Sequence, residues 1–344
     1  MAVSVRDVAA VAAVSVGTVS NVLNRPDKVA PATAERVLAA IASLGFVRND
    51  AARQLRAGRS RSIGLVVLDI RNPFFTDIAR GAEERAAEKG MTLLVGSSQE
   101  DPDREGAYLD LFLEQRVSGV LLSPVADTRD RLERLRSNGV PVVLVDRQSK
   151  DHTFSSVAVD DVVGGRLAVR HLVDVGRRRI AYVGGPPSIR QVADRLRGAR
   201  QAVRRAPGVE LEVVQTDALT VLAGRAAGEL IRERRPGDRP DAIFAANDLL
   251  AIGILQALML PGGVRVPEDI ALIGYDDIDF ASASVVPLSS IRQPAGVIGR
   301  RAVELLLDES FAEDDGSFET DRVLFQPELI VRESTRSGPP SERS

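Results

Sequence analysis

Acidic and amide side chains stand directly after short apolar segments, where they could hold a polar ligand. Asp146 follows PVVLV, Asn247 follows AIFAA and Asp276 follows ALIGY. A carboxylate accepts hydrogen bonds from two hydroxyl groups, and an amide both donates and accepts. Such a set is suited to a polyol or a sugar. For each residue alone a structural role is an equal alternative, since Asn247 could cap a helix and Asp276 could occupy a turn.

Residue types that commonly perform catalysis are scarce. The chain has no cysteine and two histidines, His152 and His171, which excludes thiolate nucleophiles and His/Cys zinc sites. It lacks G-x-S-x-G and Walker-type motifs. Asp160 and Asp161 could act as an acid–base pair, but adjacent acids at a strand end are more typical of caps and solvated surfaces. The sequence predicts a binding protein rather than an enzyme, with no metal and no cofactor.

From residue 61 onwards, short apolar runs alternate with amphipathic stretches, as in parallel βαβ units. The first set of predicted strands comprises 62–68, 91–96, 119–123 and 141–145, with helices at 74–89, 103–115 and 129–138. The second set comprises strands at 179–183, 210–214, 241–245 and 269–273, with helices at 161–175, 189–205, 218–234 and 248–259. Two such sets predict an α/β body of two doubly wound parallel-sheet lobes.

The position of a residue relative to these strands predicts a ligand cleft. Ligands of open α/β sheets bind beyond the carboxyl ends of the strands. From strand position alone this rule selects residues 69–75, Ser123, Asp146, 184–189, Asn247 and Asp276. We expect them to line one cleft.

Residues 4–45 have the pattern of an all-α helix-turn-helix module. Ser4 and Ser15 are predicted N-caps, with Asp7 in the first turn after Ser4. Pro31 is predicted to begin a third helix and Gly45 to end it. The apolar positions recur at helical spacing, namely Val5, Val8, Ala9 and Ala12; Val16, Val19 and Val22 or Leu23; and Val37, Ile41 and Leu44.

The second of these helices presents small, uncharged residues to solvent instead of Glu and Lys. Such a helix fits the major groove of DNA. Val16, Gly17 and Asn21 are the predicted base contacts. The predicted phosphate contacts are Ser4, Ser15, Thr18, Ser20, Asn24, Lys28 and Thr33. A plain three-helix bundle explains the apolar positions but not the composition of this face.

A short helix is predicted at 49–56, before Gly58. Eight residues do not hold a helix alone in water, so this segment needs a second copy of itself, DNA, or both. Leu55 is its one large apolar side chain, and we predict that it contacts bases by entering the minor groove and kinking the duplex. A linker with an incidental leucine is an equal alternative.

Charge is distributed unevenly along the 344 residues. Residues 1–60 hold eight Lys or Arg and four Asp or Glu, a net charge of +4, whereas the whole chain carries −3. A basic module on an acidic body favours a polyanionic partner for the module. The absence of cysteine, of a secretory signal and of any apolar run of about 20 residues predicts a cytoplasmic location and no membrane contact.

Taken together, these motifs resemble the LacI/GalR family of bacterial transcription regulators. The resemblance covers about residues 3–333 and rests on 6–24, 29–33, 49–58, 62–68, NPFF (72–75), QRVSGVLL (115–122), PVVLVD (141–146), RLRG (195–198), AANDLLAIG (245–253) and IGYDDID (273–279). It implies a homodimer, a periplasmic-binding-protein-like body, a small effector in the cleft and a palindromic operator. It implies effector contacts from Phe74, Asp146, Arg195, Asn247, Asp276 and Gln293.

The chain departs from the family pattern at a few positions. Ala13 stands where the turn usually has glycine, which costs about 1 kcal/mol if that residue needs a positive φ. Ala199 replaces a common aromatic residue, and Ala218 and Leu219 stand where an aromatic often stacks on a sugar. These departures, in a chain with 4% aromatic residues, argue against a flat sugar-stacking pocket.

The sequence therefore predicts the following organisation: a headpiece at 1–47, a hinge at 48–60, a body at 61–333 and a disordered tail at 334–344, with an N-lobe at 61–159 and 290–322 and a C-lobe at 160–289 and 323–333. The expected function is that of a dimeric repressor, released from its operator, or recruited to it, by a carbohydrate-like effector. A sugar-binding sensor or transport protein without DNA binding is the alternative, and the basic headpiece argues against it.

Overall fold

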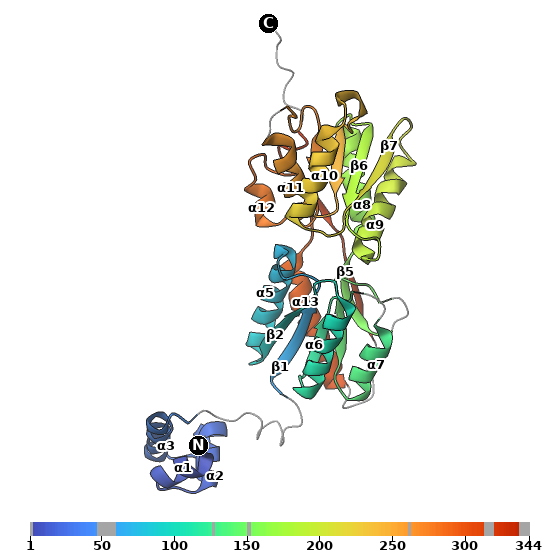
Figure 1. Cartoon of the computed structure of the whole chain (residues 1–344). Coiled ribbons are helices and arrows are strands. Elements are labelled where there is room, and N and C mark those ends of the chain that lie inside the picture. Colours follow the sequence, from blue (N-terminus) through green and yellow to red (C-terminus); the bar gives the residue numbers. More distant parts are fainter. Residues whose placement is uncertain are drawn as a thin grey trace. The chain divides into compact units, whose positions relative to one another are not determined.

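The computed structural model describes residues 3–46, 60–125, 128–149, 153–260, 263–312 and 320–336. Contacts between residues divide the chain into two units, Met1–Ser60 and Arg61–Ser344 (Figure 1). The predicted hinge, including Leu55, lies outside the described residues apart from Ser60.

The N-terminal unit contains helices α1 (Val5–Val11), α2 (Val16–Asn24) and α3 (Pro31–Leu44), with the 3-10 turn η1 (Pro26–Lys28) between the last two. The predicted caps are confirmed, because the Ser4 and Ser15 hydroxyls accept hydrogen bonds from the N–H groups of Asp7 and Thr18. Gly45 ends α3 at φ 61°. The buried core consists of Val8, Ala9, Ala12, Val19, Val22, Val37, Ala40 and Phe46.

The N-lobe of the second unit is a six-stranded parallel sheet in the order β11-β5-β4-β3-β1-β2. Its strands are β1 (Ser62–Val67), β2 (Thr92–Ser97), β3 (Gly119–Leu122), β4 (Val142–Val145), β5 (Ser155–Val159) and β11 (Arg322–Phe325). Helices α5 (Pro73–Glu88), α6 (Pro102–Glu114), α7 (Arg129–Ser137) and α13 (Ala295–Ala312) belong to this lobe (Figure 1).

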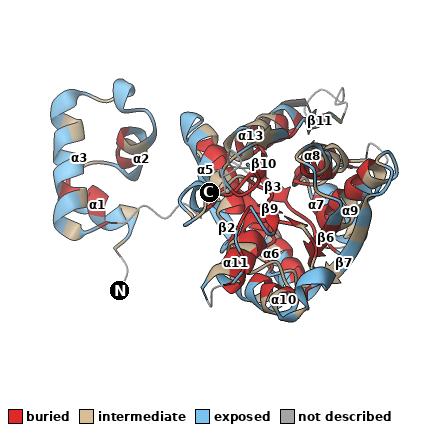
Figure 2. Cartoon of the chain, turned by 90° about the horizontal axis from the view of Figure 1, so that it is seen from above, coloured by how far each residue is buried: buried red, intermediate tan, exposed pale blue. Residues whose placement is uncertain are grey.

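The C-lobe is a four-stranded parallel sheet in the order β7-β6-β8-β9. Its strands are β6 (Arg179–Gly184), β7 (Glu210–Gln215), β8 (Ala242–Ala245) and β9 (Ala271–Ile273). The helices are α8 (Asp161–Asp174), α9 (Arg190–Val203), α10 (Val221–Glu233), α11 (Asp248–Met259) and α12 (Asp279–Ser282), with a 3-10 turn η2 (Pro236–Asp238). Figure 2 shows the central strands of the body as buried and the outer helix faces as exposed.

The chain passes between the lobes after β5, before α13 and after β11, and the sequence prediction was incomplete in these segments. It missed strands β5 and β11, helix α13 and the antiparallel pair of β10 (Ser290–Arg292) with β12 (Glu328–Ile330). The predicted N-lobe segment 290–322 begins too early, because β10 bridges to C-lobe residues. It also ends too early, because all of β11 pairs with β5 of the N-lobe.

The predicted disordered tail begins too early. Ser334 and Thr335 are fully buried. The Ser334 hydroxyl donates to the Leu272 carbonyl at 2.5 Å and accepts from the Ser289 N–H at 2.8 Å. Their burial against β9 places both residues in the C-lobe, whereas residues 337–344 lie outside the described part of the chain.

Among the described residues, no single helix is both long and apolar enough to cross a membrane; α1 and α2 taken together meet those criteria but bend by 104° at their junction.

Candidate functional site

Polar side chains from both lobes line one narrow cavity of ≈ 40 Å³. Asp69 and Asn72 follow β1, and Asp146 follows β4 in the N-lobe. Asn247 and Asp276 follow the C-lobe strands β8 and β9. Carboxyl ends of parallel strands in both sheets therefore meet at this cleft, as their positions predicted.

Two hydrogen-bonded contacts join the lobes across the cleft. The Asn72 amide donates to Asp276 Oδ2 at 3.1 Å. The Gln191 amide donates to both the carbonyl and Oδ2 of Asp146 at 2.8 Å. All four side chains are buried, so these contacts hold the walls together and explain the small volume of the cavity.

Arg195 is the buried cation of the cleft, with 4% of its surface exposed. Its Nε donates to Asp161 Oδ1 at 2.8 Å, its Nη1 donates to the Ala246 carbonyl at 2.7 Å, and Nη1 lies 3.8 Å from Asp276 Oδ1. The guanidinium carbon lies 3.7 Å from the centre of the Tyr275 ring. Arg195 is therefore a buried residue of the cleft and not an ordinary surface ion-pair partner.

Close packing of α8 against α9 brings Arg195 to Asp161. A Cβ atom at Gly165 would lie 2.0 Å from the Arg195 carbonyl oxygen, and one at Gly198 would lie 2.1 Å from the Val162 carbonyl oxygen. Glycine at both positions lets the two helix backbones touch. The glycine of the RLRG motif thus positions the arginine that precedes it by one turn.

Burial changes the protonation of the acids in this cleft. Burial, reinforced by the charge of Asp161, raises the pKa of Asp146 to about 8. Burial also raises the pKa of Asp276 to about 6, although the charge of Arg195 opposes the change. Among the described residues, Asp146 Oδ1 has no hydrogen-bond partner. It lines the cleft and is free to bond a hydroxyl group of a ligand.

The backbone at these strand ends is in a conformation that most side chains avoid. Asp146 has φ 56°, Asp276 has φ 104° and Asp277 has φ 58°. Such residues cost on the order of 1–3 kcal/mol each and persist where the surrounding contacts hold them. Here the Asp277 carboxylate is held by Arg292 at 2.7 Å and Arg332 at 2.6 Å.

Of the other predicted cleft residues, some line the cavity and others only hold a lining residue in place. Phe74 is buried in the wall. Asn247 serves both roles, because it lines the cleft and its Oδ1 caps α11 by accepting from the Leu250 N–H at 2.9 Å. Gln293 supports Asp276 by donating to Oδ1 at 2.8 Å and is not part of the wall. Ser123 also lies outside the wall, although it is buried.

Sequence reasoning did not assign several residues at or behind the wall of the cleft, among them Asp161, Gln191 and Leu219. Asp161 follows β5, which was missing from the predicted strands, and it was interpreted as a cap or a solvated acid. Gln191 lies in the first turn of α9, and nothing in the local pattern sets it apart. Leu219 occupies the wall near the position where an aromatic residue was expected and found missing.

In the N-terminal unit, the start of α2 forms the predicted DNA-reading surface. Val16 is 46% exposed, and Gly17 and Asn21 are exposed. A Cβ atom at Gly17 would meet Ser15 Oγ at 3.5 Å, an ordinary contact, so packing does not demand glycine there. Because Gly17 has no side chain, a partner has room to approach the helix closely at this position. Ala13 precedes this helix at φ 52°, which confirms that the turn requires a positive φ.

Of the predicted phosphate contacts, Ser4, Ser15, Thr18 and Thr33 lie at the starts of α1, α2 and α3, whereas Ser20 and Asn24 lie further along α2 and Lys28 ends η1. Ser4, Ser15, Asn24 and Lys28 are exposed. Thr18, Ser20 and Thr33 are half-buried, and Ser20 accepts a hydrogen bond from the Asn24 amide at 3.2 Å. The described residues contain no group of three or more His, Cys, Asp or Glu side chains that could hold a metal ion.

Two family models match the chain. The model described as bacterial regulatory proteins, lacI family, matches residues 4–49. The model described as periplasmic binding protein-like domain matches residues 169–335.

Similar proteins align over most of the chain. The HTH-type transcriptional repressor PurR of Photobacterium profundum is 32% identical over 337 residues, covering 97% of this chain and 98% of that protein. The ribose operon repressor of Bacillus subtilis (strain 168) is 36% identical over 304 residues, covering 88% of this chain and 90% of that protein.

Solved structures match as well. The transcriptional regulator CelR in complex with cellobiose has a TM-score of 0.69 at 35% identity, over 96% of this chain and 99% of that one. The lac repressor dimer bound to operator and the anti-inducer ONPF has a TM-score of 0.82 at 28% identity, over 98% of this chain and 100% of that one.

Proposed function

This chain belongs to the lacI family of bacterial regulatory proteins, and from that premise we propose that it is a repressor controlled by a small carbohydrate-like effector in the cleft. It is a DNA-binding transcriptional regulator and not an enzyme, like the relatives named above. The observation that carries the proposal is that the strand ends of both lobes meet at one polar cleft in a chain that also has a helix-turn-helix unit.

The effector is proposed to be a polyhydroxylated molecule. Asp146, Asp276, Arg195 and Asn247 offer acceptors and donors, and Phe74 offers an apolar wall. The similar structure of CelR contains cellobiose, which supports the carbohydrate class. Leu219 in place of an aromatic side chain favours a ligand that is held by hydrogen bonds more than by stacking.

DNA binding is assigned to two headpieces in a homodimer. The two α2 helices enter successive major grooves of a palindromic operator, where Val16, Gly17 and Asn21 contact bases. The polar residues of this unit that were predicted as phosphate contacts bind the DNA backbone. Paired hinges place Leu55 of each copy in the minor groove. A protein with this role works in the cytoplasm, where bacterial DNA is found.

Regulation follows from the position of the effector between the lobes. A ligand in the cleft changes the angle between the lobes, and a changed angle separates or joins the two hinges. An effector shifts operator affinity only as far as it binds the two arrangements with different affinities. We propose that binding of the effector weakens operator binding and releases the repressor from DNA.

Selection of DNA fragments that bind the full chain tests DNA recognition. We expect a palindromic consensus, and we expect Asn21→Ala to relax preference at one base pair of each half-site by about 1–3 kcal/mol. A uniform loss of affinity for all sequences would assign Asn21 to phosphate contact. If the full chain shows no preference among fragments, the proposed function is wrong.

A thermal-shift screen of mono- and disaccharides against the full chain tests the effector class. A bound effector should raise the melting temperature of the body and weaken binding to the selected operator. Asn247→Leu should abolish the shift because it removes both the donor and the acceptor. A ligand that raises the melting temperature of Asn247→Leu as much as that of the unmodified chain binds outside the cleft.

A further inference from the structure

Two adjacent acids after β9 have different partners in the body. Asp276 lines the effector cleft, where its carboxylate accepts a hydrogen bond from Asn72 of the opposite lobe. Asp277 is not part of the cleft wall, although only 4% of its side chain is exposed. One acid therefore serves the cleft, and the partners of the other indicate a second role.

The partners of Asp277 lie in the segments that join the lobes. In chain order, the second crossover runs from β10 to α13 and the third from β11 to β12. Arg292 is the last residue of β10, and its Nε donates to Asp277 Oδ2 at 2.7 Å. Arg332 follows β12, and its Nη1 lies 2.6 Å from Asp277 Oδ1. One buried carboxylate thus joins two crossovers, with one oxygen atom for each.

The cleft acid is tied to the second crossover as well. The Gln293 amide donates to Asp276 Oδ1 at 2.8 Å, and the Asp276 N–H donates to the Ile291 carbonyl at 2.8 Å. Consecutive residues of the crossover, Arg292 and Gln293, therefore hold the consecutive acids Asp277 and Asp276. When Asp276 shifts within the cleft, this segment moves with it or one of these bonds breaks.

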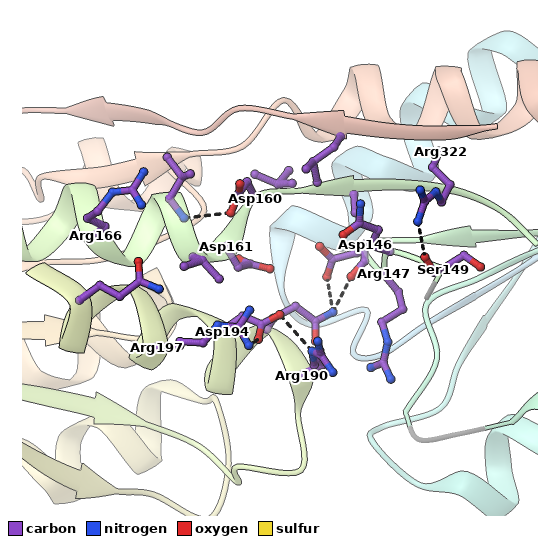
Figure 3. Close-up of a pocket in the computed structure, with 18 residues that line it drawn as sticks. Asp146, Arg147, Ser149, Asp160, Asp161, Arg166, Arg190, Asp194, Arg197 and Arg322 are labelled. Atoms are coloured by element: carbon purple, nitrogen blue, oxygen red, sulfur yellow. Dashed lines mark hydrogen bonds and ion pairs between the residues drawn. The ribbon is translucent and has the colours of Figure 1, made fainter. Parts of the chain in front are cut away.

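The first crossover, from β5 to α8, is held by separate contacts. It contains Asp160 and Asp161, which line the cavity drawn in Figure 3. Asp160 accepts from the Val163 N–H, marked by a dashed line there, and Asp161 accepts from Arg195 Nε. Neither bond involves Asp277. A substitution of Asp277 therefore removes no bond of this crossover.

We propose that Asp277 is the positioning residue that couples the effector cleft to the second and third crossovers. Its pairs with the two arginines resist displacement, because breaking them leaves a buried carboxylate uncompensated. A ligand that engages Asp276 acts through the adjoining peptide unit on Asp277, and so on two of the three segments that set the lobe angle. The assignment rests on the proposed function in one respect, namely that the cleft is the effector site.

Coupling and simple stabilisation of the C-lobe have different consequences. An acid that only stabilised the lobe would act independently of the cleft, whereas coupling makes the cleft contact and the crossover pair depend on each other. Asn72 and Arg332 report on the two ends, since Asn72 donates to Asp276 and Arg332 pairs with Asp277. No hydrogen bond or ion pair joins Asn72 to Arg332 directly within the described ranges.

Urea unfolding of the full chain, without DNA or ligand and at one chain concentration, tests the coupling. Tyrosine fluorescence follows the body, because it contains every tyrosine of the chain, namely Tyr108, Tyr182 and Tyr275. Asn72→Ser removes the amide donor and keeps an N-cap for α5. Combined with Arg332→Gln, it should change the unfolding constant by a factor that differs about threefold or more from the product of the single effects.

The same two substitutions are then made in two further backgrounds. With Asp277→Asn, which keeps the shape of the side chain and removes its charge, their effects should multiply to within about twofold. Asp269→Asn is the matched control, because Asp269 precedes β9 and also pairs with an arginine, Arg265. The departure from independence should persist in that background.

Each part of the proposal has an outcome that would overturn it. Independent effects of Asn72→Ser and Arg332→Gln in the unmodified chain would remove the coupling. Coupling that persists with Asp277→Asn, or that disappears equally with Asp269→Asn, would remove the role of Asp277. If either Arg332→Gln or Asp277→Asn does not fold, Arg292→Gln replaces Arg332→Gln in the unmodified chain, since 48% of the Arg292 side chain is exposed, and independence there is the overturning result. The measurement uses neither operator nor effector, so failure of the proposed function leaves its outcome unchanged.

Discussion

At the scale of single residues, Arg195 defines the chemistry of the effector cleft. Burial lowers the pKa of Arg195, but the neighbouring charge of Asp161 outweighs this effect. The pKa of Arg195 is therefore raised above its ordinary value, and the guanidinium stays charged. Its Nη1, which donates to the Ala246 carbonyl, also lies 3.8 Å from Asp276 Oδ1. A fixed cation between two buried acids orders their hydrogen bonds before a ligand arrives.

Arg195→Ala is expected to abolish the effector response while operator binding by the headpiece persists. Removing one member of a buried pair leaves Asp161 uncompensated, so the body should also lose about 3–5 kcal/mol of stability. Gel shifts with and without effector, together with chemical unfolding, measure both effects. Arg200→Ala, on the exposed side of the same helix, should leave both unchanged. A normal effector response in Arg195→Ala would remove this residue from the site.

Asp146 predicts a pH dependence of stability. Its folded pKa of about 8 exceeds its ordinary value of 3.8, so the folded state binds this proton more tightly than the unfolded state. Stability is therefore greatest below the unfolded pKa and falls as pH rises toward the folded pKa, by up to about 1.4 kcal/mol per pH unit.

Asp146→Asn does not titrate, so its free energy of unfolding should fall less than that of the unmodified chain between pH 5 and pH 8. Urea unfolding of the body at the two pH values measures the difference. Asp110→Asn, at an exposed position, should behave like the unmodified chain. Parallel pH profiles for Asp146→Asn and the unmodified chain would contradict burial as the cause of the raised pKa.

At the scale of elements, the turn between α1 and α2 carries a local cost. Ala13 holds φ 52°, a conformation in which a side chain meets its own backbone. Caps at both helix starts and the buried side chains Val8 and Val19 offset this cost. The module thus keeps its geometry without the glycine that the turn favours.

Ala13→Gly is expected to stabilise the headpiece by about 0.5–1 kcal/mol, because glycine adopts this φ without strain. Amide hydrogen exchange of α1 and α2 in the full chain should slow several-fold. Ala10→Gly, at an exposed helical position, should instead destabilise the headpiece and speed amide exchange. Faster exchange in Ala13→Gly would show that Ala13 is not strained.

At the scale of the whole molecule, each unit has a core of its own. The contact boundary falls between Ser60 and Arg61. The body holds its lobes together through the crossover segments and through the contacts of Asn72 and Gln191 across the cleft. Sensing and DNA reading are therefore placed in parts of the chain with separate cores.

A chain of residues 61–344 should keep the effector affinity of the full chain and lose operator binding. Its melting temperature should stay within about 2 °C, because surface changes remote from a core alter stability little. Differential scanning calorimetry and effector titration measure these properties. Loss of cooperative unfolding in the shortened chain would mean that the body depends on the headpiece.

Much of the fold followed from local patterns in the sequence. Cap residues, helical spacing and apolar runs located α1 to α3, the first four strands of the N-lobe and the four strands of the C-lobe, because each of these signals acts within one element. Strand ends then identified Asp146, Asn247 and Asp276 as cleft residues, since the βαβ arrangement places all such ends at one edge of a sheet.

Tertiary structure decided the rest, because the remaining features depend on residues far apart in the chain. The Asp161–Arg195 pair spans 34 residues and the Asn72–Asp276 contact spans 204. Strand β11 joins a sheet whose other strands end more than 160 residues earlier, and no pattern within four residues specifies that partner. The effector cleft likewise exists because the crossovers bring strand ends of two lobes together, and packing of this kind is absent from any single segment.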